Sequence, residues 1–150
     1  MDIRTDLVAE LFGTVGRFRR TVRRVAGISF VTAGLTESQA ELLRLVGRQP
    51  GISVSAAAAE LGLVANTAST LVSKLSGDGL LVRTPDPADR RVGRLELTAP
   101  AQKIADESRA ARRAALAEAL DQLDDDDAEA LAAGMRVLRD ITTKLREDKP

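Results

Sequence analysis

The feature that most constrains the fold is a pair of short helical patterns separated by a tight junction. Residues 54–61 form the first pattern, for which Ser53 is the expected cap, and Gly62 ends it. The second pattern begins within three residues and continues to the turn sequence Gly77-Asp78-Gly79. Two short helices so closely joined predict a helix-turn-helix.

A β-hairpin is expected directly after this pair of helices. Residues 80–83 are typical of a short strand, residues 84–89 of a loop, and residues 92–97 of a returning strand with Leu95 and Leu97 on one face. The sequence therefore predicts a winged helix-turn-helix with a two-stranded wing.

Longer helices are expected on both sides of this segment. Apolar residues repeat at helical spacing from Leu7 to Ala26, and Thr36 with Gln39 has the form of a capping box for a helix that ends near Arg48. Two more helices are expected, at 98–121 and from Asp124 onward. The last one carries an apolar seam that could pack against another helix, formed by Leu131, Met135, Leu138, Thr142 and Leu145.

The missing residue types exclude several kinds of chemistry. The chain has no Cys and no His, so it has no thiol sensor, no Cys/His zinc site and no imidazole base. Nothing gathers a nucleophile, a base and an orienting group, and we expect neither an enzyme nor a cofactor. The run Asp124 to Asp127 could suggest a metal site, but its position favours a helix cap, and we expect no metal.

Charge and hydropathy limit where the protein is expected to be located and what it is expected to bind. The net charge is zero, which argues against a simple basic protein that coats nucleic acid. The longest uncharged run, residues 61–73, is shorter than the roughly 20 apolar residues of a membrane span, and the N-terminus does not resemble a signal peptide. We therefore expect a cytoplasmic protein without a membrane partner.

The second short helix has two distinct faces on a helical wheel. One face is an apolar stripe. The opposite face has short hydrogen-bonding side chains, which suit a helix that enters a major groove. A solvated amphipathic helix would show the same pattern, so the helix alone leaves both interpretations open. The expected buried stripe consists of Val64, Ala68, Leu71, Val72 and Leu75.

The wing favours the nucleic-acid interpretation. Its sequence Asp86-Pro87-Ala88-Asp89-Arg90-Arg91, followed by Arg94, places three guanidinium groups on one hairpin. Arginine at a loop tip can enter a narrow minor groove, where the potential is most negative. Ordinary surface ion pairs in a solvated turn are the alternative.

Several segments together resemble the MarR family of bacterial transcription regulators. They are Leu35-Thr36-Glu37-Ser38-Gln39, Ala59-Glu60-Leu61-Gly62, Leu71-Val72-Ser73-Lys74-Leu75, Gly79-Leu80-Leu81-Val82-Arg83, the wing sequence and Leu95-Glu96-Leu97-Thr98. The resemblance implies a mainly α (α+β) fold in a single domain of residues 1–150, with a winged-helix lobe at 36–98. Residues 1–35 and 99–150 would form a helical dimerisation region.

The resemblance also implies a function. We expect a homodimeric repressor that binds an inverted repeat in double-stranded DNA and is released by a small lipophilic or aromatic acid. A winged-helix module for protein interaction is the alternative. Arg17, Arg20 and Arg24 are candidates for pairing with an acidic ligand. The expected DNA-binding residues are Asn66, Thr67, Ser69, Thr70, Ser73, Lys74, Arg83, Arg90, Arg91 and Arg94.

Overall fold

The computed structural model describes residues 2–27, 29–31 and 33–147. The chain divides into two compact units, Met1–Arg112 and Arg113–Pro150, which are described separately. The expected helical region at 1–35 and 99–150 includes residues 1, 28, 32 and 148–150, which lie outside the described part of the chain.

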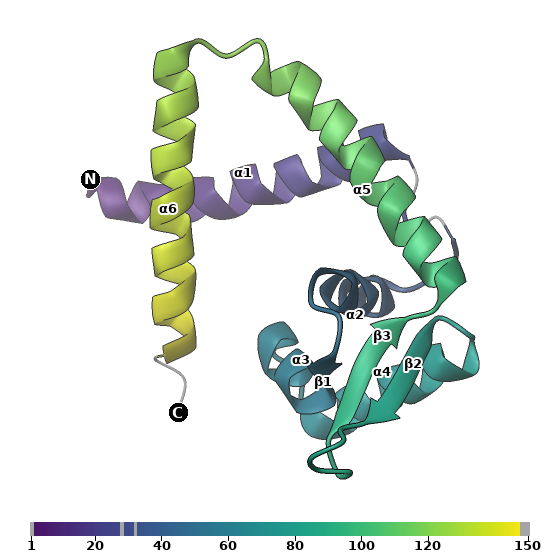
Figure 1. Cartoon of the computed structure of the whole chain (residues 1–150). Coiled ribbons are helices and arrows are strands. Elements are labelled where there is room, and N and C mark those ends of the chain that lie inside the picture. Colours follow the sequence, from purple (N-terminus) through teal and green to yellow (C-terminus); the bar gives the residue numbers. More distant parts are fainter. Residues whose placement is uncertain (1, 28, 32, 148–150) are drawn as a thin grey trace. The chain divides into compact units, whose positions relative to one another are not determined.

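The first unit contains a helical lobe with a small antiparallel sheet (Figure 1). The sheet has three strands in the order β1-β3-β2, so the expectation of two strands was incomplete. The additional strand β1 spans two residues, too few for an alternating pattern to reveal. The elements of this unit are α1 (Ile3–Ala26), α2 (Glu37–Arg48), β1 (Ile52–Ser53), α3 (Val54–Leu61), α4 (Ala65–Gly77), β2 (Leu81–Pro85), β3 (Gly93–Leu97) and the first part of α5 (Ala99–Leu120).

Local hydrogen bonds explain where these helices begin. The Thr36 hydroxyl accepts from the Gln39 amide, and the Gln39 side chain accepts from the Thr36 amide, which confirms the capping box. Ser53 caps α3 in the expected way through the Ala56 amide. The Gly62 backbone has a φ of 66°, the left-handed conformation that lets α3 stop within one residue.

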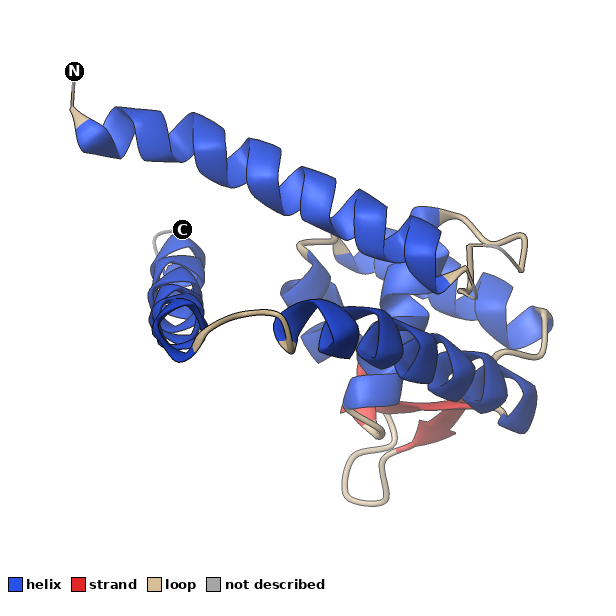
Figure 2. Ribbon diagram, turned by 90° about the horizontal axis from the view of Figure 1, so that it is seen from above, coloured by secondary structure: helices blue, strands red, loops and turns tan. Residues whose placement is uncertain are grey.

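Register within the wing follows the apolar pattern. Leu81 pairs with Leu97, and Pro85 pairs with Gly93, so β2 extends two residues into the segment expected to be a loop. Proline is tolerated there because β2 is an edge strand. The loop between β2 and β3 projects beyond the sheet (Figure 2).

A single buried cluster holds α2, α3, α4, the sheet and the start of α5 together. Val64 does not belong to it, because this residue precedes the first turn of α4 and is 70% exposed, so its place in the expected buried stripe was wrong. Phe30, from the loop before α2, is buried although no periodic pattern marks it. The cluster comprises Phe30, Ala40, Leu42, Leu43, Leu45, Val46, Ala57, Val72, Leu75, Leu81, Leu95, Ala101 and Ala105.

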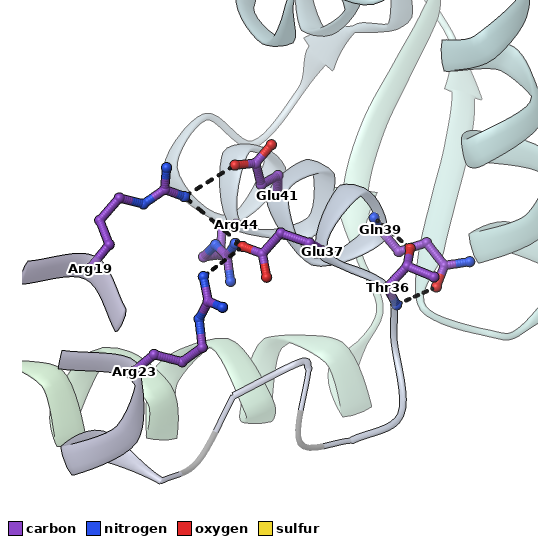
Figure 3. A network of polar contacts seen from close by, with 7 residues as sticks. All are labelled: Arg19, Arg23, Thr36, Glu37, Gln39, Glu41 and Arg44. Atoms are coloured by element: carbon purple, nitrogen blue, oxygen red, sulfur yellow. Dashed lines mark hydrogen bonds and ion pairs between the residues drawn. The ribbon is translucent and has the colours of Figure 1, made fainter. Parts of the chain in front are cut away.

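Helix α1 is attached to α2 by ion pairs. None of its residues is buried, and most of its apolar side chains, including Phe12 and Phe18, are exposed in this single chain. Arg23 lies 3.2 Å from Glu37, and Arg19 lies 3.2 Å from Glu41 (Figure 3). An apolar helix face of this length without a partner is typical of an interface.

The second unit contains the end of α5 and the helix α6 (Asp125–Glu147). Asp124 caps α6, since its carboxylate accepts from the Asp127 amide at 2.8 Å. Across the described residues, no group of three acidic side chains is arranged to hold a metal ion. Within the same residues, no helix combines the length and hydropathy needed to cross a bilayer.

Candidate nucleic-acid interface

Helix α4 presents a polar face to solvent, as the sequence predicted. Its inner side is buried through Ala68, Val72 and Leu75. The exposed residues of the helix include every position expected to face a groove or a phosphate, namely Asn66, Thr67, Ser69, Thr70, Ser73 and Lys74.

Two of these polar groups are already engaged within the helix. The Thr70 hydroxyl donates to the Asn66 carbonyl at 2.9 Å, and Lys74 Nζ lies 3.2 Å from Asp78 Oδ1. The side chains of Asn66, Thr67 and Ser69 make no hydrogen bond with any other described residue. The N-terminal half of α4 therefore has the side chains that are most available to a partner.

The base of the wing is organised around one carboxylate. Asp86 accepts from the amides of Ala88 and Asp89 at 2.8 and 3.2 Å, and from Arg94 Nε at 2.8 Å. Arg94 also donates to the Gly51 carbonyl at 3.4 Å, which links the wing to the turn before β1. The bond from Arg94, supported by the two amides, lowers the pKa of Asp86.

The wing tip presents arginines to solvent. Arg90 is exposed, and the side chain of Arg91 is 94% exposed, with its Nε 3.5 Å from Asp89 Oδ1. Arg83 is exposed on β2, where it lies over Gly93. The structure thus brings Arg83, Arg90 and Arg91 to one hairpin, whereas Arg94 holds the hairpin base; whether each contacts DNA stays a prediction.

The Asp86 cluster gives a pH dependence with a definite sign. Because its folded-state pKa is below the ordinary value of 3.8, Asp86 stabilises the wing at pH values above 3.8, and this contribution disappears as the pH falls through the lowered pKa. In NMR titrations of the folded protein, we expect the Ala88 amide shift to change with a midpoint below 3.8. Asp86→Asn should abolish that transition. A wild-type midpoint at or above 3.8 would contradict the hydrogen bonds that Asp86 accepts from Arg94 and the two amides.

The arginines expected to bind an acid are placed differently. Arg17, Arg20 and Arg24 are exposed on α1 and line neither of the two cavities found beside α2. Arg19 lines one of those cavities, together with Arg44. The sequence pattern gave no means to choose among the α1 arginines, because all of them lie off the apolar stripe. That Arg17, Arg20 and Arg24 bind an acidic ligand stays a prediction.

Comparison with known structures supports the winged-helix class. FabT of Streptococcus pneumoniae, solved in complex with DNA, superposes with a TM-score of 0.76 at 19% identity, over 94% of this chain and 96% of FabT. A MarR family protein from Bacillus stearothermophilus gives a TM-score of 0.72 at 22% identity, over 95% and 99% of the two chains. These similarities establish a winged helix-turn-helix fold with long flanking helices.

Sequence similarity to known proteins covers the winged-helix lobe. Residues 33–92 match the model of the MarR family. A "transcriptional regulatory protein for hcr operon" of Thauera aromatica is 32% identical over 88 residues, which are 59% of this chain and 51% of that protein, so the match spans about half of the relative's length. These matches show that the winged-helix lobe is similar in sequence to the MarR family. The named relatives are regulators rather than enzymes.

Proposed function

We propose that this protein is a transcription regulator that binds a specific sequence in double-stranded DNA. One observation carries the proposal: the unpartnered polar end of α4 and the exposed arginines of the wing belong to the same lobe. Helix side chains read base edges in a major groove, while loop arginines suit the minor groove beside it. FabT, a protein of the same fold, was crystallised with DNA. Binding to the chromosome would place the protein in the cytoplasm.

The proposed contacts fall into two groups. Asn66, Thr67 and Ser69 are positioned for base edges, since their side chains have no partner among the described residues. Arg83 and the wing-tip arginines would supply the electrostatic part. Thr70 and Ser73 lie further along the exposed face, and Lys74 and Arg94 must leave Asp78 and Asp86 before they contact a phosphate.

We also propose that the protein acts as a homodimer. Both α1 and α6 carry large apolar side chains that the single chain leaves exposed, including Phe12, Phe18, Leu131 and Met135. A second copy covering these surfaces would create a two-fold axis and two copies of α4. Such a dimer prefers an inverted repeat whose half-sites lie about 10 base pairs apart.

A winged-helix module that binds another protein is the competing function. The zero net charge is compatible with it. Salt dependence separates the two, because phosphate contacts weaken steeply as salt rises, whereas an apolar protein contact need not.

Arg91 and Asn66 are expected to differ in what they contribute to DNA binding. Arg91→Ala should weaken binding to all duplexes and reduce the slope of log affinity against log salt by about 1, because one phosphate contact is lost. Asn66→Ala should cost about 1 to 3 kcal/mol and relax preference at one base pair while keeping the slope. Fluorescence anisotropy with specific and random duplexes, from 50 to about 200 mM salt, measures both. Identical behaviour of the two variants would contradict these roles.

Gly93 is expected to control where Arg83 lies. A Cβ at Gly93 would overlap Arg83 Nε, and a flexible side chain moves more easily than the strand backbone. Gly93→Ala should therefore displace Arg83 and weaken DNA binding by about tenfold, and Arg83→Ala should have the same effect, because a charged hydrogen bond is lost in both. The double variant should bind no more weakly than either single variant. Additive losses at constant salt would show that Gly93 acts independently of Arg83.

We also propose that a small lipophilic or aromatic acid releases the protein from DNA. Such an acid shifts the dimer only if it binds the DNA-free arrangement more tightly than the DNA-bound one. Linkage then requires DNA to weaken binding of the acid by the same factor.

A further inference from the structure

Four arginines of the first unit converge on one cavity. Arg44 and Arg48 lie one turn apart on α2, and Arg109 and Arg112 lie one turn apart on α5. All four line a cavity of about 220 Å³, together with Phe30 and the buried Ser108. No sequence pattern marks this group, since its two halves are separated by more than 60 residues.

A close approach of the two helices brings the pairs together. A Cβ at Gly47 would lie 3.3 Å from Leu97 Cδ1, 3.9 Å from Ala105 Cβ and 3.9 Å from Arg109 Nη2. Glycine at this position of α2 thus leaves room for α5 and for the guanidinium of Arg109. Ala101 and Ala105, both buried, anchor this part of α5 on the core. The arginines therefore extend from elements that the core holds in place.

Among the described residues, the ion pairs within 4.0 Å involve one of these four arginines, Arg44. Arg44 lies 2.8 Å from Glu37, which also lies 3.2 Å from Arg23 and 4.0 Å from Arg19 (Figure 3). No carboxylate oxygen of a described residue lies within 4.0 Å of the guanidinium nitrogens of Arg48, Arg109 or Arg112. Arg112 Nε donates to the Ser108 carbonyl at 3.3 Å, a neutral partner.

The like charges of these arginines change the pKa of Arg112. Partial burial lowers the pKa of Arg112, and the charges of Arg44, Arg48 and Arg109 lower it further. Like charges held near one another destabilise the folded chain unless an anion compensates them.

A neighbouring cavity of about 390 Å³ is electrostatically different. It shares Arg44, Arg48 and Arg112 with the first and also has Arg19, but Glu41 and Glu60 line it as well. Carboxylates at its edge disfavour an anion there. The 220 Å³ cavity, whose charged lining consists of the four arginines, is the better anion site.

We propose that this cavity binds a small ligand that carries a phosphate or pyrophosphate group, and that the ligand regulates DNA binding. A planar carboxylate offers two oxygens in one plane, whereas a phosphoryl group offers three in different directions, which suits arginine forks approaching from two helices. Phe30 and Ala105, which are almost completely buried, form the apolar part of the cavity wall. The effect on DNA rests on the proposed function, but the binding site does not.

The binding test uses inorganic pyrophosphate as the probe and the full-length protein without DNA. Calorimetric titration at constant ionic strength should show saturable binding to wild type and binding at least about tenfold weaker for benzoate, which carries one charge. Arg48→Gln, Arg109→Gln and Arg112→Gln should each weaken pyrophosphate binding by about tenfold or more. Arg113→Gln is the matched control, because Arg113 is exposed on the same helix and does not line the cavity. Equal affinities for all four variants would overturn the site.

A second measurement separates the site from the proposed function. The same variants are titrated with duplex DNA, and wild type is titrated with and without pyrophosphate. Weaker DNA binding in the presence of pyrophosphate, lost in Arg112→Gln, supports regulation through the cavity. Variants that lose DNA affinity but keep pyrophosphate affinity would show a DNA contact instead and overturn the proposal. Pyrophosphate binding without any DNA binding would overturn the proposed regulation and the proposed function, while the anion site would stand.

Discussion

Met135→Glu is expected to convert the protein from a dimer to a monomer. Met135 lies on the predicted seam of α6 and is 43% exposed in the single chain, so a partner helix must cover it in the proposed dimer. Removal of a carboxylate from water at an apolar interface costs several kcal/mol. The dissociation constant of the dimer should therefore rise at least about a hundredfold.

The matched control for this substitution is Val137→Glu. Val137 is 57% exposed on the same helix but lies two residues from Met135, which places it on the opposite side of α6. Sedimentation equilibrium at micromolar concentration should find Val137→Glu dimeric and Met135→Glu monomeric. If Met135→Glu remains a dimer, or if wild type is a folded monomer at this concentration, the seam is not the interface.

Leu43→Ala is expected to give the largest loss of stability among single substitutions considered. Leu43 is fully buried in the cluster that joins α2 to the sheet and to α5. The substitution removes buried methyl groups and leaves a cavity, which lowers the free energy of unfolding by about 2 to 5 kcal/mol.

Val64→Ala is the control, since Val64 is 70% exposed and its truncation should change stability by only about 0.5 kcal/mol. Urea unfolding at one protein concentration compares the two, because the stability of a dimer depends on concentration. A change at Leu43 as small as the change at Val64 would contradict the placement of the core.

Local chemistry made most of the fold predictable from the sequence. Thr36 with Gln39, Ser53 and Gly62 each act through residues a few positions away, so the bounds of α2 and α3 followed from short motifs. The wing was equally accessible, because Leu95 and Leu97 alternate with polar residues and a proline-containing loop precedes them. The MarR resemblance rested on these same segments.

Features that depend on contacts between distant segments were missed or misplaced. Strand β1 forms only because Ile52 meets Leu95, and Phe30 is buried in a cluster with residues of α2 and α5 that are distant in the sequence. Val64 was misplaced because a helical wheel assumes that the residue before the helix is part of it.

The roles of charged residues were the least predictable. Arg91 and Arg94 lie three residues apart, yet Asp86 holds Arg94 at the base of the wing, whereas Arg91 is exposed at the tip beside Asp89. The cavity arginines could not be found at all, since only the packing of α5 across Gly47 brings them together.

Selection of bound sequences from random duplex DNA tests the central claim most directly. The full-length protein is incubated with a randomised library at fixed salt, and bound duplexes are amplified and sequenced over several rounds. The proposed regulator should enrich an inverted repeat with half-sites about 10 base pairs apart, and Asn66→Ala should relax one position in each half-site. Recovery of unrelated sequences without two-fold symmetry would contradict specific binding by a winged-helix dimer.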